Sequence, residues 1–268
     1  MNKIFKFFRG LWRIFQKPYL INLVLETPAY YQSLVVKKYG MSRGFPQLHI
    51  TDFDRNFNET VEPYAFLEGG STPMDLAMLK KLARHINATD YLEIGTWRGE
   101  SVANMAKVVK RCYTLNLPTE SLLEMGKSEA YAGAHKFFSK DIPGVTHIAG
   151  HSHTYDFEKL HRKFDIIFID GDHHYDAVKK DTATAFKLLK NQSSIIVWHD
   201  YGATPEHIRW DVMLGILDGC PDDKKHKIFH IDRTLCAAYI PDMNSEDFMT
   251  PYSLPDYHFK VDISINNQ

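Results

Sequence analysis

Cysteine is scarce in this chain, and its placement excludes two classes of protein. Cys112, Cys220 and Cys236 are odd in number, lie far apart and show no CxxC spacing. Neither a disulfide framework nor a zinc site is therefore expected. The same pattern leads us to infer a reducing, cytoplasmic setting.

The chain also lacks an excess of either charge. Its 32 basic and 33 acidic side chains give a net charge of −1 over 268 residues. A chain with this balance has no general attraction for nucleic acid, so we expect no nucleic-acid partner. With 44% hydrophobic residues and no repeat or low-complexity tract, it is long enough to bury a proper core. The oligomeric state stays open, a homo-oligomer included.

No long apolar run is present either, although the first twenty residues are both apolar and basic. Basic residues recur every three or four positions, and no acidic residue precedes Glu26. These charges argue against a signal peptide and against a membrane-spanning helix. A helix with aromatic residues on one side and cations on the other fits the headgroup plane of an anionic membrane. We expect peripheral membrane contact through residues 1–20, at the inner face of the membrane; packing of this helix on its own domain or on a second copy is the alternative.

Three segments are predicted along the chain. Residues 1–71 hold the basic helix and then a connector or cap, in which glycine and proline punctuate short apolar pieces. Residues 72–242 form one α/β domain, and residues 243–268 form a C-terminal tail. The domain begins with a clear helix start, because Thr72 caps, Pro73 suits the first helical position and Asp75 follows three residues after the cap.

The domain alternates between strand-like and helix-like patterns. Seven strands are predicted, at residues 91–94, 113–117, 145–149, 164–169, 194–198, 227–231 and 235–240. Several are near-continuous apolar runs, which are typical of strands buried on both faces of a parallel sheet. The order predicts a doubly wound, Rossmann-like seven-stranded sheet with helices between the strands.

Ligands of such sheets bind beyond the carboxyl ends of the strands, and the first strand ends in a glycine motif. The motif is Glu93-Ile94-Gly95-Thr96-Trp97-Arg98-Gly99-Glu100-Ser101. A dinucleotide fingerprint needs a third glycine between these two, where Trp97 stands and would obstruct a pyrophosphate. A carboxylate two residues before the first glycine instead suits a ligand with a cationic centre and an amino acid part, which favours a sulfonium nucleoside over NAD.

Three motifs together resemble a known family. They are the ExGxxxG motif after the first strand, Phe168-Ile169-Asp170-Gly171-Asp172-His173 after the fourth and Trp198-His199-Asp200-Tyr201 after the fifth. This set resembles class I S-adenosylmethionine-dependent methyltransferases, and more narrowly methyltransferase family 24, which includes sugar and macrolide-sugar O-methyltransferases. The resemblance covers residues 62–240. It implies that the last strand is antiparallel and that residues 72–242 are the methyltransferase domain.

The resemblance also implies a cofactor site. Four residues would wall the methionine part of S-adenosylmethionine, with Ser101 nearby at the helix start; they are Glu93, Gly95, Thr96 and Gly99. The second strand ends at Asn116, where the class commonly places an acidic residue that accepts both ribose hydroxyls. Asn116 would hold only part of that contact.

Titratable residues follow the fourth and fifth strands, and they predict the chemistry. In one mechanism, a divalent cation held by Asp170, His199 and Asp200 orients and acidifies a substrate hydroxyl. In the other, His173 acts as the general base. The two mechanisms can also cooperate. We assign the catalytic roles to Asp170, His173 and Asp200. Hard oxygen ligands favour magnesium or calcium, and His199 shifts the preference of the set toward manganese or zinc. The alternative for Asp170 and Asp200 is that they cap the helices that follow them.

The predicted function is transfer of a methyl group from S-adenosylmethionine to a hydroxyl. The acceptor is expected to be a saccharide or a glycosylated small molecule, which rests on the family resemblance. The competing hypothesis is a protein that keeps the fold, has lost catalysis and serves as a binding scaffold at a membrane surface. A nicotinamide-dependent enzyme is disfavoured by the glycine spacing.

Overall fold

The computed structural model of the protein describes residues 3–21, 25–252 and 254–266. Residues 1–2 of the expected membrane segment and parts of the expected tail, 253 and 267–268, lie outside the described residues. The helices are α1 (Lys3–Gln16), η1 (Pro18–Ile21), α3 (Pro28–Tyr39), α4 (Ile50–Phe53), α5 (Pro73–His85), α6 (Glu100–Met105), α7 (Thr119–Glu124), α8 (Glu129–Ala134), η2 (Phe157–Leu160), α9 (Tyr175–Leu188), η3 (Pro205–His207), α10 (Trp210–Gly219) and η4 (Asp222–Lys227). The strands are β1 (Gln47–Leu48), β2 (Asp90–Ile94), β3 (Arg111–Asn116), β4 (Val145–Ala149), β5 (Ile166–Ile169), β6 (Ile195–Trp198), β7 (Ile228–Ile231) and β8 (Ala237–Tyr239).

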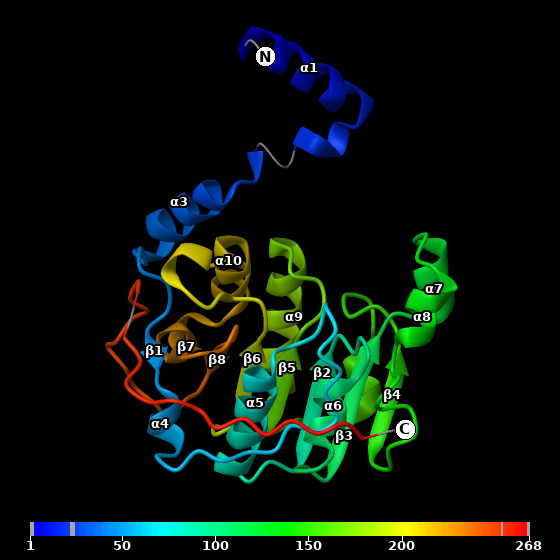
Figure 1. The fold of residues 1–268 in the computed structure, drawn as a ribbon, viewed down its shortest axis with the longest axis vertical. Coiled ribbons are helices and arrows are strands. Elements are labelled where there is room, and N and C mark those ends of the chain that lie inside the picture. Colours follow the sequence, from blue (N-terminus) through cyan, green and yellow to red (C-terminus); the bar gives the residue numbers. More distant parts are fainter. Residues whose placement is uncertain (1–2, 22–24, 253, 267–268) are drawn as a thin grey trace.

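One mixed sheet forms the centre of the molecule (Figure 1). Its strand order is β1-β7-β8-β6-β5-β2-β3-β4. Every pair is parallel except the two made by β8, which runs antiparallel to β6 and β7. The predicted doubly wound α/β fold with an antiparallel last strand is therefore confirmed. The order reverses between β2 and β5, which is where such sheets bind ligands.

The predicted number of strands is wrong, because the sheet has eight. The additional strand is β1, whose residues pair with His230 and Ile231 of β7. Two residues are too few to show an alternating pattern, and they lie in the segment expected to be a connector. That segment also supplies Phe45, Leu48 and Ile50 to the core. The sheet thus takes in chain from before residue 72.

Helices cover both faces of the sheet, and each covered face has its own core. On one face, α9 and α10 pack against the sheet through residues such as Val178, Ala185 and Met213. On the other face, α5 and α6 contribute Met78, Leu82 and Val102 to the core. The strands between them are buried throughout, for example all of β2 and β5. Thr182, a buried polar residue of α9, accepts a hydrogen bond of 2.8 Å from the Trp198 indole.

The start of α5 is built as the sequence predicts. Thr72 Oγ1 accepts from the Asp75 amide, and the Asp75 carboxylate accepts from the Thr72 amide at 2.7 Å. This reciprocal capping box satisfies two amides that a helix end would leave without partners. It also fixes the place of the Asp75 side chain, which lies in the core.

Helix α1 stands apart from the sheet, on the side of the molecule where the parallel strands end (Figure 1). None of its residues is buried. Its apolar side chains are 48–78% exposed; they are Ile4, Phe5, Phe7, Phe8, Leu11, Trp12 and Phe15, while Ile14 is partly covered. No helix among the described residues is long and apolar enough to cross a membrane.

Candidate active site

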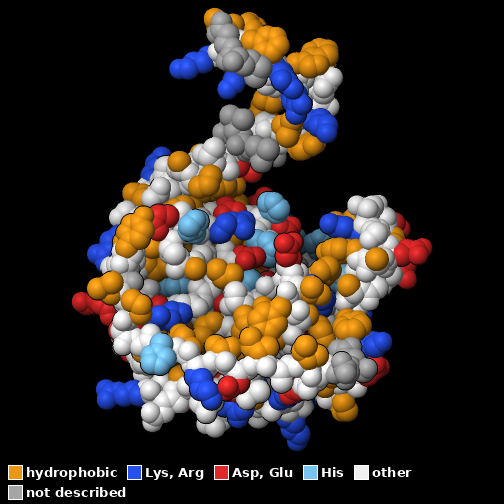
Figure 2. Space-filling model, viewed as in Figure 1, with side chains coloured by type: hydrophobic (Ala, Val, Ile, Leu, Met, Phe, Trp, Pro, Cys, Tyr) orange, Lys and Arg blue, Asp and Glu red, His pale blue; other side chains and the backbone are white. Residues whose placement is uncertain are grey.

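A small cavity opens at the carboxyl ends of β2 and β5. Its walls come from the glycine motif, from the connector before α5 and from the end of β5; they are Gly69, Gly70, Ser71, Leu76, Thr96, Trp97, Arg98, Gly99, Glu100, Ser101 and Asp170. Three of the predicted cofactor residues, Thr96, Gly99 and Ser101, thus line it. Around it, Figure 2 shows acidic and histidine side chains gathered in a hollow of this face.

The two glycines of the motif are required by their neighbours. Gly95 has φ +101°, and a Cβ there would lie 2.1 Å from the Asp170 carbonyl oxygen. Gly99 has φ +81°, and a Cβ there would lie 2.1 Å from Ser139 Oγ. Both conditions exclude an L side chain. Gly95 therefore lets the ends of β2 and β5 approach each other, which brings the glycine motif next to Asp170.

Glu93 lies beside the cavity without lining it. Its side chain is fully buried and accepts from Tyr91 Oη at 2.5 Å and from Thr114 Oγ1 at 3.1 Å. Burial raises its pKa to about 8, although hydrogen bonds from Tyr91 and Ser101 oppose this. Glu93 therefore supports Ser101, which does line the cavity.

Asn116 ends β3 as predicted, and its amide group is already engaged. Asn116 Nδ2 lies 2.6 Å from His135 Nδ1 and also donates to the Leu117 carbonyl at 3.3 Å. Burial lowers the pKa of His135, whose other ring nitrogen, Nε2, is buried without a hydrogen bond. Its ring packs against Trp97 and Tyr131. His135 has no local motif around it, so sequence reasoning missed this contact.

Arg98 is a second residue that sequence reasoning missed, although it lies inside the glycine motif. Its guanidinium donates to the carbonyls of Glu68 at 2.8 Å and Leu67 at 3.0 Å, and pairs with Glu100 at 3.2 Å. Arg98 therefore holds the connector over the cavity. Ser71 of the same connector donates to Asp170 Oδ2 at 3.1 Å.

Four titratable residues that follow β5 and β6 lie close together. His199 Nδ1 lies 3.1 Å from Asp170 Oδ1 and 3.2 Å from Asp200 Oδ1, while His173 Nδ1 lies 3.1 Å from Asp200 Oδ2. Asp200 adopts φ +58°, a left-handed conformation that aspartate tolerates better than most residues. His199 is buried, whereas the His173 side chain is 40% exposed. Asp170 belongs both to this cluster and to the cavity wall.

The carboxylates of the cluster favour the charged form of His199, and His199 in turn favours the charged form of Asp200. Burial opposes a charged His199, but the carboxylates of Asp170, Asp200 and Asp75 outweigh it and raise the pKa of His199 well above its usual 6.5. Burial likewise would raise the pKa of Asp200, but the close approach and charge of His199 lower it to about 2. Asp200 is therefore an anion at neutral pH.

The donor set of this cluster fits a divalent cation. Ligand atoms of Asp170, His173 and Asp200 lie within 4.8 Å of one another. His199 Nδ1 faces Asp170 and Asp200 at ion-pair distance, yet it makes no hydrogen bond of acceptable geometry. The two carboxylates supply oxygen ligands of the kind that magnesium and manganese take, and the imidazole nitrogen shifts the preference away from magnesium.

The alternative that Asp170 and Asp200 are helix caps does not describe this structure. The N-cap of α9 is His174, and the N-caps of η3 and α10 are Thr204 and Arg209. His174 lies on the surface, 85% exposed, next to Asp172. The two aspartates therefore have no capping role at the helices that follow them.

Comparison with known proteins agrees with these motifs. Residues 92–201 match the family model described as a methyltransferase domain, that of methyltransferase family 24. No curated protein matches the chain by sequence. Residues 92–201 are thus similar to a methyltransferase domain, the kind of domain that the three sequence motifs resemble.

Three solved structures illustrate what the fold is similar to. An O-methyltransferase from Bacillus cereus in complex with SAH is 17% identical, with 65% of this chain and 84% of that chain covered and a TM-score of 0.43. TomG, an O-methyltransferase from Streptomyces achromogenes involved in tomaymycin synthesis and bound to SAM, is 18% identical, with 64% and 81% covered and a TM-score of 0.40. CalS10, a SAM-bound amino pentose methyltransferase from Micromonospora echinaspora, is 18% identical, with 55% and 61% covered and a TM-score of 0.37.

Proposed function

We propose that this protein is an S-adenosylmethionine-dependent O-methyltransferase. The observation that carries the proposal is the position of Asp170, which joins the wall of the cavity to the cluster with His199 and Asp200. A sulfonium donor seated against Thr96, Gly99 and Ser101 would present its methyl group toward that cluster. The amide oxygen of Asn116 would accept one ribose hydroxyl. The inactive scaffold hypothesis gains no support from a cluster so fully assembled.

The cluster supports a direct displacement. The acceptor oxygen attacks the methyl carbon, the carbon–sulfur bond breaks with its electron pair going to sulfur, and the hydroxyl proton must leave. The Asp200 carboxylate favours a proton on His173 Nδ1, so Nε2 of His173 is available to accept the hydroxyl proton. Positioning and this proton transfer are all that such a displacement requires.

Asp170, Asp200 and His199 would hold a divalent cation, magnesium or manganese, whose charge would acidify the acceptor hydroxyl. The acceptor we propose is a saccharide or a glycosylated small molecule, since its hydroxyls are of the kind that such a site activates. Support for the sugar comes from the family resemblance and from the amino pentose methyltransferase among similar structures.

The test of this function is transfer of a labelled methyl group from S-adenosylmethionine to a panel of hydroxylated sugars. Chelator should abolish the transfer, and added magnesium or manganese should restore it. Asp200→Ala should not be rescued by either cation, because a carboxylate facing His199 is lost. Full activity in chelator would remove the cation from the mechanism and leave His173 as the sole activating group.

We further propose that α1 rests on an anionic membrane surface. Its sequence divides into two sides at helical spacing, Phe7, Leu11 and Phe15 on one and Lys6, Arg9 and Arg13 on the other. Exposed apolar surface of this extent marks an interaction site. Cations beside it, without a neighbouring acidic residue, complement anionic headgroups at about 1 kcal/mol each. The protein would then act at the inner face of a membrane.

A further inference from the structure

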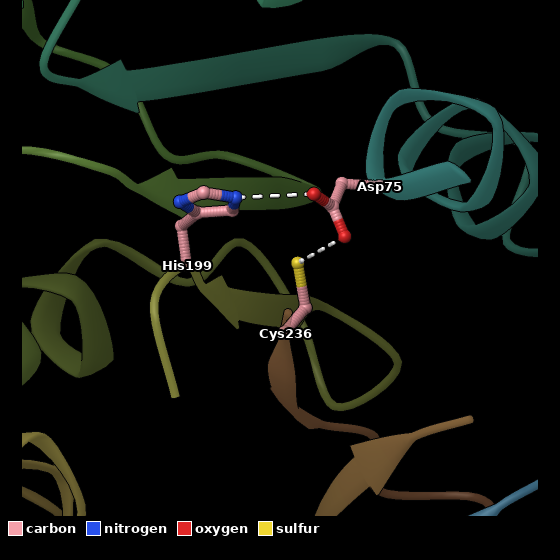
Figure 3. A group of neighbouring side chains, drawn as sticks. All are labelled: Asp75, His199 and Cys236. Carbon is pink, nitrogen blue, oxygen red and sulfur yellow. Dashed lines mark hydrogen bonds and ion pairs between the residues drawn. The ribbon is translucent and has the colours of Figure 1, made fainter. Parts of the chain in front are cut away.

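Asp75 lies far from His199 in the sequence, and the fold brings the two side chains together. Asp75 stands in the first turn of α5, whereas His199 follows β6. His199 Nε2 lies 3.1 Å from Asp75 Oδ2, and both side chains are at most 5% exposed (Figure 3). Asp75 therefore contacts the Nε2 edge of the imidazole, whereas the Nδ1 edge points toward Asp170 and Asp200.

The carboxylate of Asp75 is held rigidly. Oδ2 also accepts from the Thr72 amide at 2.7 Å, and Oδ1 accepts from the Leu235 amide at 2.8 Å and from Cys236 Sγ at 3.7 Å. These contacts come from α5 and from the turn between β7 and β8. The carboxylate thus cannot turn away from His199 without losing several buried hydrogen bonds.

The group Asp75, His199 and Cys236 is not itself a metal centre. Its ligand atoms lie within 4.8 Å of one another, but both carboxylate oxygens of Asp75 are occupied by hydrogen bonds. Burial raises the pKa of Cys236 well above 9, so its sulfur is a thiol, whereas metal binding needs the thiolate. The role of Asp75 is therefore directed at His199.

We propose that Asp75 is a positioning residue for the cation site. A carboxylate that accepts from Nε2–H of His199 fixes the ring orientation. When a cation displaces the proton from Nδ1, the Nδ1 lone pair then points at the space between Asp170 and Asp200. Outer carboxylates of this kind orient histidine ligands in many metal sites. The inference rests on the proposed cation and assigns a role to a residue outside its ligands.

The test compares cation affinity in the full chain and in Asp75→Asn. The asparagine side chain has the same size as that of aspartate, but its amide can donate an N–H to His199 Nε2. Nε2 then accepts a hydrogen bond, and the imidazole proton stays on Nδ1, the nitrogen that would bind the cation. We expect the affinity for Mn²⁺, measured by calorimetry and by electron paramagnetic resonance, to fall about 10- to 100-fold. The affinity for S-adenosylmethionine should stay unchanged.

Thr72→Ala is the matched control. It removes the hydroxyl that caps the same helix turn and leaves the Asp75 carboxylate on His199. It should lower the melting temperature yet bind Mn²⁺ like the natural chain. Equal Mn²⁺ affinity in Asp75→Asn and in the natural chain would overturn the inference. If the natural chain binds S-adenosylmethionine but no Mn²⁺, the cation site and this inference both fall, and the methyltransferase proposal stands.

A second measurement needs no variant. Nitrogen-15 chemical shifts of His199 in the Mg²⁺-saturated natural chain should show a protonated Nε2 and an Nδ1 without a proton. The opposite tautomer would overturn the proposal even if Asp75→Asn failed to fold.

Discussion

At the scale of single residues, we expect His173 to accept the hydroxyl proton of the acceptor. His173→Ala should lower turnover by about 10²-fold or more, because the imidazole that would accept the hydroxyl proton beside Asp200 is lost. The affinity for S-adenosylmethionine should not change, since His173 is not part of the cavity wall. Steady-state kinetics and calorimetry measure the two quantities.

The neighbouring His174 offers a matched control. It is 85% exposed and pairs with Asp172 instead of Asp200. His174→Ala should keep nearly full turnover. Unchanged turnover in His173→Ala would assign proton removal to a different group of the cluster.

The residues that the sequence allowed us to predict are those with a local signature. Thr72 and Asp75 form the expected capping box because both partners lie within one turn of helix. The contact between Asp75 and His199 could not be predicted, since it joins elements 124 positions apart. Asn116 marked a departure from the family pattern, but its partner His135 lies on a segment with no recognisable motif.

At the scale of elements, α1 is the helix that we propose to bind a membrane surface. Deleting residues 1–20 should release the protein from vesicles of phosphatidylcholine and phosphatidylserine, because the apolar side and the cations are lost together. Sedimentation with the vesicles measures binding. Added salt should weaken binding of the natural chain by screening the cations.

Two single substitutions test whether vesicle binding depends on the apolar side of α1 in particular or on any exposed apolar residue. Phe15→Asp places a charge on the apolar side of α1, at a side chain 78% exposed, and should weaken vesicle binding. Ile265→Asp changes a tail residue that is 90% exposed and should bind as before. Equal binding by the truncated chain would reject the membrane contact.

The sheet shows where element prediction succeeds and fails. Strands such as β5 are apolar at every position because helices cover both faces, and that pattern is visible in the sequence. Strand β1 is held by a long-range pairing with β7, and also by Asp247 and Ser245 of the tail, which bond to Gln47. Its two residues carry no periodic signal, so only the folded chain identifies them as a strand.

At the scale of the whole molecule, an ion-pair cluster at Asp90 ties β2 to β3 and to the segment after α9. The Asp90 carboxylate is buried, with Arg111 at 2.5 and 2.7 Å and Lys190 at 3.0 Å. The hydrogen bond from Arg111, aided by Thr89 and Lys190 against the effect of burial, holds the pKa of Asp90 well below its usual 3.8. A lowered pKa in the folded state stabilises the fold at pH values above the unfolded pKa, and this stabilisation is lost as pH falls through the folded pKa.

Asp90→Asn should accordingly lower the free energy of unfolding at pH 7 by about 1–3 kcal/mol, the range for hydrogen bonds to charged groups. The difference from the natural chain should shrink as pH falls below the unfolded pKa near 3.8. Urea denaturation at several pH values measures it. The control Asp222→Asn breaks an ion pair whose carboxylate is 99% exposed, and it should leave the free energy of unfolding almost unchanged. A difference for Asp90→Asn that does not vary with pH would contradict the ion-pair account.

The central claim is that the edge of the sheet between β2 and β5 binds S-adenosylmethionine for methyl transfer. The most direct test is calorimetric titration of the full chain with S-adenosylmethionine and with its demethylated product, each with and without magnesium. We expect both compounds to bind with a Kd on the order of micromolar, and magnesium to increase the affinity once a hydroxylated acceptor is present. Absence of binding under every condition would contradict it.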